Sequence, residues 1–273
     1  MSGEVRRGTG PWPSANIESE VRRWLLSRMG SVEVEEREGM ALRLMEHESG
    51  QSRGARLIEG RRWSESELDR LAARAARLAE GEPLQHVLGQ VWFDGMALHV
   101  TPDVLIPRPE TEELAAWMAG KLAEVSHSAP RALDWCTGSG CIALSLKKRV
   151  PRAEVHAWDV SEQALNVAQA NAEALGLNVT AAESDLLSAS PPSWAFHLVV
   201  SNPPYIPAAE RSDMHARVVD HEPALALFVP DLDPLLFYCA LSRWCEDGGL
   251  SEAGWLGMEC HQAYAGDVAA LQQ

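Results

Sequence analysis

The sequence predicts an α/β protein in which a parallel sheet carries helices on both faces, preceded by a small helical domain and a linking β-hairpin. Three observations predict this class. The first 85 residues carry apolar positions at helical spacing, a hairpin signal follows, and strand-like and helix-like segments alternate from Arg131 onward. The predicted domains are a helical domain at 1–85, the hairpin linker at 86–109 and the α/β domain at 110–273.

The helical domain is predicted from three amphipathic segments. Apolar residues recur at helical spacing in 17–29 and again in 34–47. A third helix is predicted from Ser64 to Gly81, because Ser64 and Glu67 have the spacing of a capping box. No alternating apolar run interrupts these segments, so the region is predicted to contain helices only.

The hairpin is predicted from two short apolar runs, 87–93 and 96–101. Asp94-Gly95 lies between them, and this dipeptide is typical of a tight two-residue turn. Three prolines then break the chain before a predicted helix at 110–124. The hairpin is therefore expected at the joint between the two domains.

Five strands and the helices between them are predicted for the α/β domain. Alternation at this spacing is typical of βαβ units, which build a parallel sheet. We expect the sheet to stop after the fifth strand, with no closing hairpin and with an exposed C-terminal helix. The predicted strands are 132–136, 154–158, 178–182, 196–201 and 255–260, and the predicted helices are 141–149, 161–175, 232–246 and 262–272.

Composition excludes several classes of protein. With 46% hydrophobic residues among 273, the chain can bury a core, so wholesale disorder is excluded. No apolar run is long enough to span a membrane, and the N-terminus lacks the apolar stretch of a secretory signal. Five cysteines without a C-x-x-C pair argue against a disulfide framework and a zinc knuckle. We predict a reducing, cytoplasmic compartment, no metal site and no membrane partner.

Negative charge is concentrated in the larger part of the chain. Residues 1–85 hold 14 Lys/Arg and 15 Asp/Glu, a net of -1, whereas the other 10 and 24 give residues 86–273 a net of -14. Such a surface repels phosphate backbones, which disfavours a nucleic-acid substrate. The alternative is that the acidity serves only solubility.

A glycine loop follows the first predicted strand, where open α/β sheets bind ligands. The segment Asp134-Trp135-Cys136-Thr137-Gly138-Ser139-Gly140 opens directly into a predicted helix. Glycines let the backbone approach a ligand, and the helix N-terminus offers free N–H groups. With Ala143 the segment also fits the G-x-G-x-x-A dinucleotide fingerprint. A purely structural turn is the alternative.

Two acidic residues follow the next strands. Asp159 lies about 20 residues past the glycines, a spacing typical of an acid that holds ribose hydroxyls. The alternative is a helix N-cap formed by Asp159 or Ser161. Asp185 could accept a hydrogen bond from an adenine amine while Leu186 covers the ring, although Asp is common in loops.

The loop after the fourth strand reads Asn202-Pro203-Pro204-Tyr205. Two prolines fix the backbone and remove two N–H donors. The Pro203 carbonyl and the Asn202 side-chain oxygen can then accept hydrogen bonds from a planar NH2 group, and Tyr205 offers an aromatic face to the same group. A structural Pro-Pro loop would need neither the asparagine nor the tyrosine.

Several motifs together resemble one known family. The chain is similar to class I S-adenosylmethionine-dependent methyltransferases, which have a Rossmann-like domain. Within them it resembles the peptide chain release factor glutamine N5-methyltransferases, the HemK/PrmC family, over roughly residues 15–272. The motifs are Pro83-Leu84-Gln85-His86-Val87-Leu88-Gly89, Leu105-Ile106-Pro107-Arg108-Pro109-Glu110-Thr111-Glu112, Asp134 to Gly140, Ser201-Asn202-Pro203-Pro204-Tyr205-Ile206 and His221-Glu222-Pro223-Ala224-Leu225-Ala226-Leu227.

This resemblance implies an activity, a cofactor and a partner. The activity is methyl transfer from S-adenosylmethionine to the glutamine side-chain amide in the Gly-Gly-Gln loop of a release factor. The helical domain would dock that protein, nucleic acid would not bind directly, and the enzyme is expected to be a monomer.

The implied site residues fall into four groups. The catalytic residues are Asn202, Pro203 and Tyr205, and Pro204 joins them in binding the substrate. Arg108, Glu110, Thr111 and Glu259 would support the site. The residues expected to bind the cofactor are Asp134, Cys136, Thr137, Gly138, Ser139, Gly140, Asp159, Asp185, Leu186 and Asn202.

The sequence departs from the family pattern at two points. Trp135-Cys136 replaces the usual Leu-Gly of the glycine loop, so a Cβ stands where the family leaves room for the methionine part of the cofactor. The final antiparallel hairpin of the family fold is also expected to be missing, because the chain ends at Gln273 just after the helix that follows the fifth strand.

Three other functions fit parts of the sequence. Asn-Pro-Pro-Tyr is shared with nucleic-acid adenine or guanine methyltransferases, which the acidic domain disfavours. An NAD-dependent oxidoreductase would use the glycine loop and Asp159 but leaves Asn202–Tyr205 unexplained. An inactive binding module is favoured by Cys136 and the short C-terminus.

Overall fold

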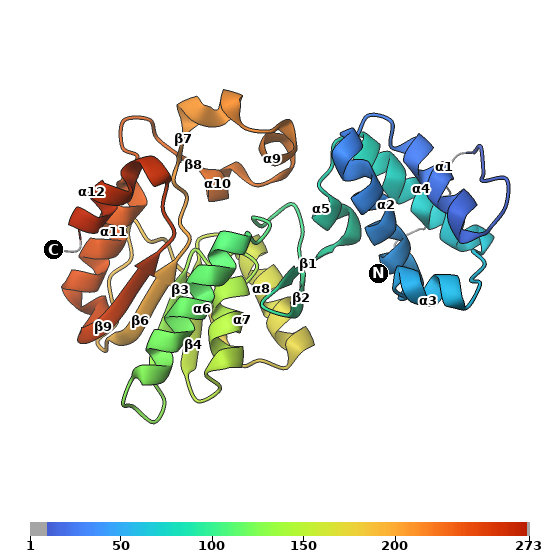
Figure 1. Ribbon diagram of the computed structural model, residues 1–273. Helices are drawn as coiled ribbons and strands as arrows, with labels where there is room; N and C mark the ends of the chain where they lie inside the picture. Colours follow the sequence, from blue (N-terminus) through green and yellow to red (C-terminus); the bar gives the residue numbers. More distant parts are fainter. Residues whose placement is uncertain (1–9, 272–273) are drawn as a thin grey trace. The chain divides into compact units, whose positions relative to one another are not determined.

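The computed structural model describes residues 10–271, and these form two compact units. One unit extends through Gly89 and the other begins at Gln90 (Figure 1). No helix among the described residues is long and apolar enough to cross a membrane.

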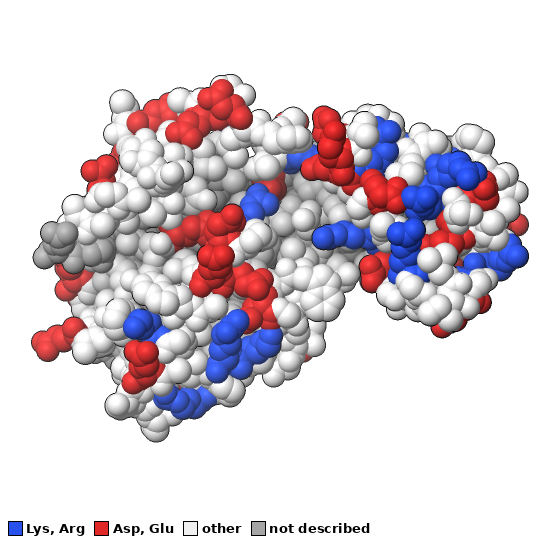
Figure 2. Space-filling model, viewed as in Figure 1, with Lys and Arg blue, Asp and Glu red and all other residues white. Residues whose placement is uncertain are grey.

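The first unit is helical, as the sequence predicts. Its helices are α1 (Glu18–Arg28), α2 (Val34–Ser49), α3 (Arg53–Ile58), α4 (Glu65–Ala79) and α5 (Leu84–Leu88). The capping box of α4 is confirmed, since the Ser64 hydroxyl accepts a hydrogen bond from the Glu67 N–H and the Glu67 carboxylate accepts one from the Ser64 N–H. Cationic and anionic side chains intermingle on the face of this unit drawn in Figure 2.

Residues 87 and 88 were predicted to begin a strand, and this prediction is wrong. They form the last turn of α5, which follows Pro83 and ends at Gly89. Gly89 has a φ of 69°, a left-handed conformation that glycine adopts without cost and that commonly ends helices. The strand therefore starts only at Gln90.

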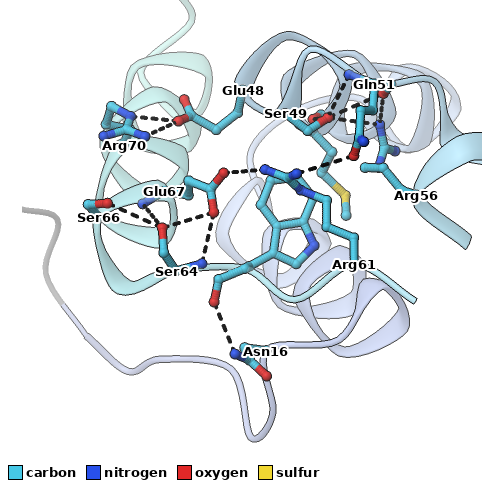
Figure 3. A network of polar contacts seen from close by, with 12 residues as sticks. Asn16, Glu48, Ser49, Gln51, Arg56, Arg61, Ser64, Ser66, Glu67 and Arg70 are labelled. Carbon is cyan, nitrogen blue, oxygen red and sulfur yellow. Dashed lines mark hydrogen bonds and ion pairs between the residues drawn. The ribbon is translucent and has the colours of Figure 1, made fainter. Parts of the chain in front are cut away.

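The core of the helical unit contains a buried ion pair beside its apolar residues. Val21, Leu25 and Leu44 are fully buried there. Arg56 is also 0% exposed, and its guanidinium lies 3.0 Å from the Glu18 carboxylate. It also donates to the Gln51 carbonyl at 2.6 Å, within the polar network of Figure 3. This pairing offsets the large cost of removing the charge from water.

The second unit is built on a five-stranded parallel sheet of order β5-β4-β3-β6-β9, which confirms the predicted α/β class. Within residues 10–271 no strand pairs with the other edge of β9. The strands are β3 (Arg131–Trp135), β4 (Glu154–Asp159), β5 (Thr180–Glu183), β6 (Phe196–Ser201) and β9 (Leu250–Met258).

Helices cover both faces of this sheet (Figure 1). One face packs against α6 (Pro109–Glu124), α7 (Cys141–Arg149) and α8 (Glu162–Leu175). The other packs against α11 (Leu236–Trp244), where Trp135 and Trp244 meet edge to face at 5.6 Å. Neighbouring residues of one strand pack into the cores on opposite faces of the sheet, because successive side chains of a strand point to opposite faces.

The C-terminal elements differ from the predicted boundaries. The helix predicted at 232–246 begins only at Leu236, after Pro234, since a proline disfavours helix in the residue before it. A π-helical turn at Cys245–Gly249 follows it, and β9 starts at Leu250, earlier than predicted. The last predicted helix consists of a 3-10 turn at Gln262–Tyr264 and α12 (Ala265–Ala270), which is largely exposed.

The predicted hairpin consists of β1 (Gln90–Phe93) and β2 (Met96–His99). Asp94 and Gly95 have φ angles of 49° and 66°, and two positive values are typical of the hairpin turn that the sequence predicts. The Asp94 carboxylate accepts from Ser145 at 2.7 Å and from Arg149 at 2.8 Å, both on α7. The hairpin thus packs within the second unit.

The chain between β6 and α11 forms smaller elements beside the sheet. Strands β7 (Ile206–Pro207) and β8 (Phe228–Val229) pair in parallel, and α9 (Ala216–His221) and α10 (Ala224–Leu227) lie between them in the sequence. This excursion carries the segment around Glu222 toward the carboxyl end of the sheet, where the Glu222 side chain contacts the residues that precede α6.

Candidate functional site

A cavity that is open to solvent lies at the carboxyl ends of β3, β4 and β6. The loops after these three strands are the ones that the sequence nominates most strongly, and the structure brings them together. The lining residues are Asp103, Val104, Leu105, Pro107, Thr111, Cys136, Thr137, Gly138, Ser139, Cys141, Ile142, Asp159, Val160, Ser161, Ala164, Asn202, Pro204, Pro223, Leu225, Ala226 and Phe237.

The glycine loop turns through three residues with positive φ: Cys136 at 57°, Gly138 at 54° and Gly140 at 80°. A Cβ on Gly138 would meet nothing within 4 Å, so this glycine leaves open space at the cavity. A Cβ on Gly140 would lie 3.1 Å from the Ala168 Cβ, so this glycine lets α8 pack closely. Cys136 adopts a conformation that costs a residue with a side chain about 1–2 kcal/mol.

Asp134 is fully buried and holds the glycine loop rather than lining the cavity. Its Oδ2 accepts from the Thr137 hydroxyl at 2.6 Å and from the Ala143 N–H at 3.1 Å. Its Oδ1 has no hydrogen-bond partner in the described part of the chain. Burial, and then the charge of Asp159, raises the pKa of Asp134 to about 7. A buried, half-satisfied carboxylate of this kind favours a nearby cation.

Asp159 connects the glycine loop to the end of β4. Its Oδ2 accepts from the Gly138 N–H at 2.9 Å, and its Oδ1 accepts from the Ser161 N–H at 3.0 Å. Ser161 is the N-cap of α8, because its hydroxyl accepts a hydrogen bond from the Ala164 N–H. Asp159 therefore does not cap this helix. Burial raises its pKa. Asp159 lines the cavity, and each carboxylate oxygen can accept a further hydrogen bond.

Asp185 and Leu186 are not among the residues that line the cavity. The Asp185 carboxylate accepts from the Leu187 N–H at 3.0 Å and from the Ser188 hydroxyl at 3.1 Å, within its own turn. Leu186 is buried in the core that contains Trp135. The role of these two residues toward adenine stays a prediction.

The loop that follows β6 joins a hydrogen-bonded chain of side chains. The Asn202 Nδ2 donates to the Thr111 hydroxyl at 3.2 Å, and that hydroxyl donates to the Glu259 Oε2 at 2.6 Å. The Tyr205 hydroxyl donates to the other oxygen of Glu259 at 3.1 Å. Burial, and then Glu259, raises the pKa of Tyr205 to about 12, so the phenol stays protonated at neutral pH.

The two prolines of this loop occupy different positions. Pro204 lines the cavity beside Asn202, whereas Pro203 is buried and is not among the lining residues. Tyr205 does not line the cavity, and its hydroxyl donates a hydrogen bond to Glu259. Of the four residues, Asn202 is therefore the one that presents polar side-chain atoms to the cavity.

Glu222 contributes to the site in a way that its local sequence pattern did not predict. Its side chain is 1% exposed, and its Oε1 lies 2.6 Å from the Arg108 guanidinium. Its Oε2 accepts from the Ile106 N–H at 2.9 Å. Glu222 thus fastens the segment around it to the segment that precedes α6. Its place within a family motif was the available signal. Glu110 is exposed and makes no such contact among the described residues.

All the charged side chains that line the cavity are acidic. They are the carboxylates of Asp103 and Asp159, and the lining contains no Lys or Arg. The remaining surface is largely apolar and includes Val160, Leu225 and Phe237. Such a lining favours a ligand with an apolar body and positive charge. The sequence did not predict Asp103 as a site residue, because an Asp after a proline in a loop is common.

No group of three or more His, Cys, Asp or Glu side chains that could hold a metal ion occurs within the described ranges. Cys136 and Cys141 both line the cavity as free thiols. Burial raises the pKa of the Cys141 thiol to about 12 and also raises that of Cys136, so both thiols are protonated and poorly nucleophilic at neutral pH.

Two protein families match separate parts of this chain. Residues 20–89 match the PrmC N-terminal domain, and residues 117–224 match the Methyltransferase small domain. A ribosomal protein L11 methylase from Lactobacillus delbrueckii subsp. bulgaricus is 20% identical with a TM-score of 0.43, over 66% of this chain and 76% of that one.

Two relatives match a larger share of the sequence at higher identity. The release factor glutamine methyltransferase of Bacteroides thetaiotaomicron is 45% identical over 71% of this chain and 69% of the relative. That of Flavobacterium psychrophilum is 42% identical over 71% and 68%. The chain therefore belongs to the release factor glutamine methyltransferase family.

Proposed function

We propose that this protein transfers the methyl group of S-adenosylmethionine to the side-chain amide nitrogen, N5, of the glutamine in a Gly-Gly-Gln motif of a peptide chain release factor. Membership of the family supports the reaction class. The observation that carries the proposal is Asn202, an amide at the cavity edge whose Oδ1 has no partner among residues 10–271.

The cavity suits S-adenosylmethionine, whose sulfonium and ammonium groups are cationic. The carboxylates of Asp103 and Asp159 attract positive charge, and Asp159 can accept from both ribose hydroxyls. The open side of Gly138 leaves room for the cofactor. When bound, the cofactor supplies an electrophilic methyl group with a good leaving group. A dinucleotide, the alternative ligand, would bring a diphosphate to a lining without Lys or Arg.

The acceptor amide is a weak nucleophile, because its lone pair is delocalised into the carbonyl. The Asn202 Oδ1 and the Pro203 carbonyl would accept its two N–H groups and hold the nitrogen in line with the methyl carbon. A C–N bond then forms as the methyl carbon–sulfur bond breaks, and the nitrogen releases a proton to solvent. Orientation of this kind can lower a barrier by about 7–11 kcal/mol.

The experiment incubates the enzyme with S-adenosylmethionine carrying a labelled methyl group and with a release factor. We expect label on the peptide that contains Gly-Gly-Gln and none when that glutamine is replaced by alanine. Asn202→Ala should reduce turnover far more than cofactor affinity, because Asn202 acts on the acceptor amide. Label transferred to DNA or RNA but not to the release factor would refute the proposal and favour the nucleic-acid alternative.

The helical unit would provide the docking surface for the release factor. Most of its arginines are paired with acids; Arg70 and Arg74, for example, both contact Glu48. Three exposed arginines have no ion-pair partner among the described residues: Arg43, Arg53 and Arg62. These positive charges are available to an acidic surface of the partner.

Changing Arg43, Arg53 and Arg62 to glutamate should lower kcat/KM for the intact release factor. It should leave kcat/KM for a short Gly-Gly-Gln peptide unchanged, because the peptide reaches only the cavity. The charge reversal Arg152→Glu in the other unit is the control. Equal effects on the peptide and on the intact protein would contradict docking by the helical unit.

A further inference from the structure

Three segments far apart in the sequence meet in one chain of hydrogen bonds at the edge of the cavity. Asn202 follows β6, Thr111 lies in the first turn of α6, and Glu259 follows β9. Thr111 is 2% exposed, so water does not compete for its hydroxyl. The Thr111 hydroxyl lies 3.2 Å from the Asn202 Nδ2 and 2.6 Å from the Glu259 Oε2.

The chemistry of these groups dictates the direction of each bond. An ionised carboxylate can only accept, so the single hydroxyl proton of Thr111 goes to Glu259. The Thr111 oxygen then has only lone pairs left, and the group of Asn202 that faces it must be the donor, the NH2. The carbonyl oxygen of Asn202 is consequently at the other end of the amide, on the side away from Thr111.

The second oxygen of Glu259 reinforces this arrangement. It accepts from the Tyr205 hydroxyl at 3.1 Å, which fixes the carboxylate from the opposite side. The backbone does the same, since the Glu259 N–H donates to the Ser201 carbonyl at 3.0 Å and holds the end of β9 beside the loop that carries Asn202. Glu259 is thus held both by a neighbouring strand and by a side chain.

We infer that Thr111 and Glu259 are positioning residues that lock the Asn202 amide with its oxygen toward the substrate, and that this lock makes the site select a carboxamide over a carboxylate. The inference rests on the proposed function, because it concerns the same acceptor group. A locked oxygen accepts from the NH2 of a glutamine and repels the carboxylate of a glutamate. A flipped amide would present its NH2 and do the opposite.

The test compares Thr111→Val, which has nearly the same shape but no hydroxyl, with Thr111→Ser, which keeps the hydroxyl. Thr180→Val, at an exposed position on β5, is the control for the same chemical change. We expect Thr111→Val to lower kcat on a Gly-Gly-Gln peptide by about 10- to 100-fold, the scale of leaving a buried hydrogen-bonding group without its partner. The KM for S-adenosylmethionine should not change, and Thr111→Ser should restore kcat.

A second readout is inhibition by a Gly-Gly-Glu peptide. The wild-type enzyme should resist this peptide, and Thr111→Val should be inhibited by it, because its Asn202 amide is free to flip. A merely structural role of Thr111 would not change this preference. Glu259→Leu, which cannot accept the Thr111 hydroxyl proton, should shift the preference in the same direction and serves if the valine variant does not fold.

Two outcomes would overturn the inference: an unchanged preference between the two peptides in both folded variants, or failure of Thr111→Ser to restore kcat. Failure of the proposed function is distinct, since the wild-type enzyme would then methylate no glutamine at all.

Discussion

Gly138 and Gly140 lie two residues apart in the same loop, and we expect alanine to act differently at each. Both have positive φ, 54° and 80°, so either substitution carries the left-handed cost of about 1–2 kcal/mol. Only at Gly140 does the added Cβ meet a neighbour, at 3.1 Å from the Ala168 Cβ and 3.3 Å from the Ala168 Cα. At Gly138 nothing lies within 4 Å.

The difference between the two variants isolates the packing cost. Crowding a well-packed core costs about 1–3 kcal/mol, so Gly140→Ala should lower the free energy of unfolding by about that much more than Gly138→Ala. Ala168→Gly removes the nearest atom and should recover part of this difference in a double-mutant cycle. Urea unfolding followed by tryptophan fluorescence measures the wild type, the three single variants and the double variant, and Trp135 and Trp244 report on the core beneath the loop.

Gly140→Ala should be the less stable of the two variants, whereas Gly138→Ala should be the one that binds the cofactor less tightly. The Cβ of Gly138→Ala would enter the open space at the cavity, so calorimetry should show weakened S-adenosylmethionine binding in a protein that remains folded. At temperatures where it is folded, Gly140→Ala should have an affinity for S-adenosylmethionine closer to that of the wild type. The reasoning would be refuted if Gly138→Ala were the less stable variant, or if it bound the cofactor unchanged.

Three further predictions follow from buried charges. Asp159→Ala should weaken S-adenosylmethionine binding by about 1.5–3 kcal/mol, the scale of hydrogen bonds to a charged group, and unchanged affinity by calorimetry would contradict its ribose role. Glu18→Ala leaves Arg56 buried without its counter-ion, so the helical unit should lose about 3–5 kcal/mol of stability in chemical unfolding monitored by circular dichroism; a loss below about 1 kcal/mol would contradict the argument. Burial raises the pKa of Asp134 from its usual 3.8 to about 7, so the folded state binds a proton that the unfolded chain releases between these values, and the free energy of unfolding should fall as pH rises through that window. Asp134→Asn should flatten this fall in urea titrations at several pH values, and an equally steep fall would show that other groups cause it.

The elements that the sequence predicts best are those with strong local signals. The capping box at Ser64 and the Asp94-Gly95 turn both form as predicted, because the interactions that specify them lie within a few residues. The glycine loop and Asn202 were located for a related reason: a strand that precedes a loop places it at the carboxyl edge of a parallel sheet. The short helix α5 was missed because its five residues are too few to show a period.

The sequence by itself determined the α/β class, the positions of the glycine loop and of the loop that carries Asn202, and the family. Only the tertiary structure decided what holds those loops. Thr111 and Glu259 are 148 residues apart, and Ile106 and Glu222 are 116 apart, yet each pair shares a hydrogen bond at the site. No local pattern encodes such a contact. These hydrogen bonds stabilise the protein only after the sheet has brought distant strand ends together and excluded water from the polar groups between them.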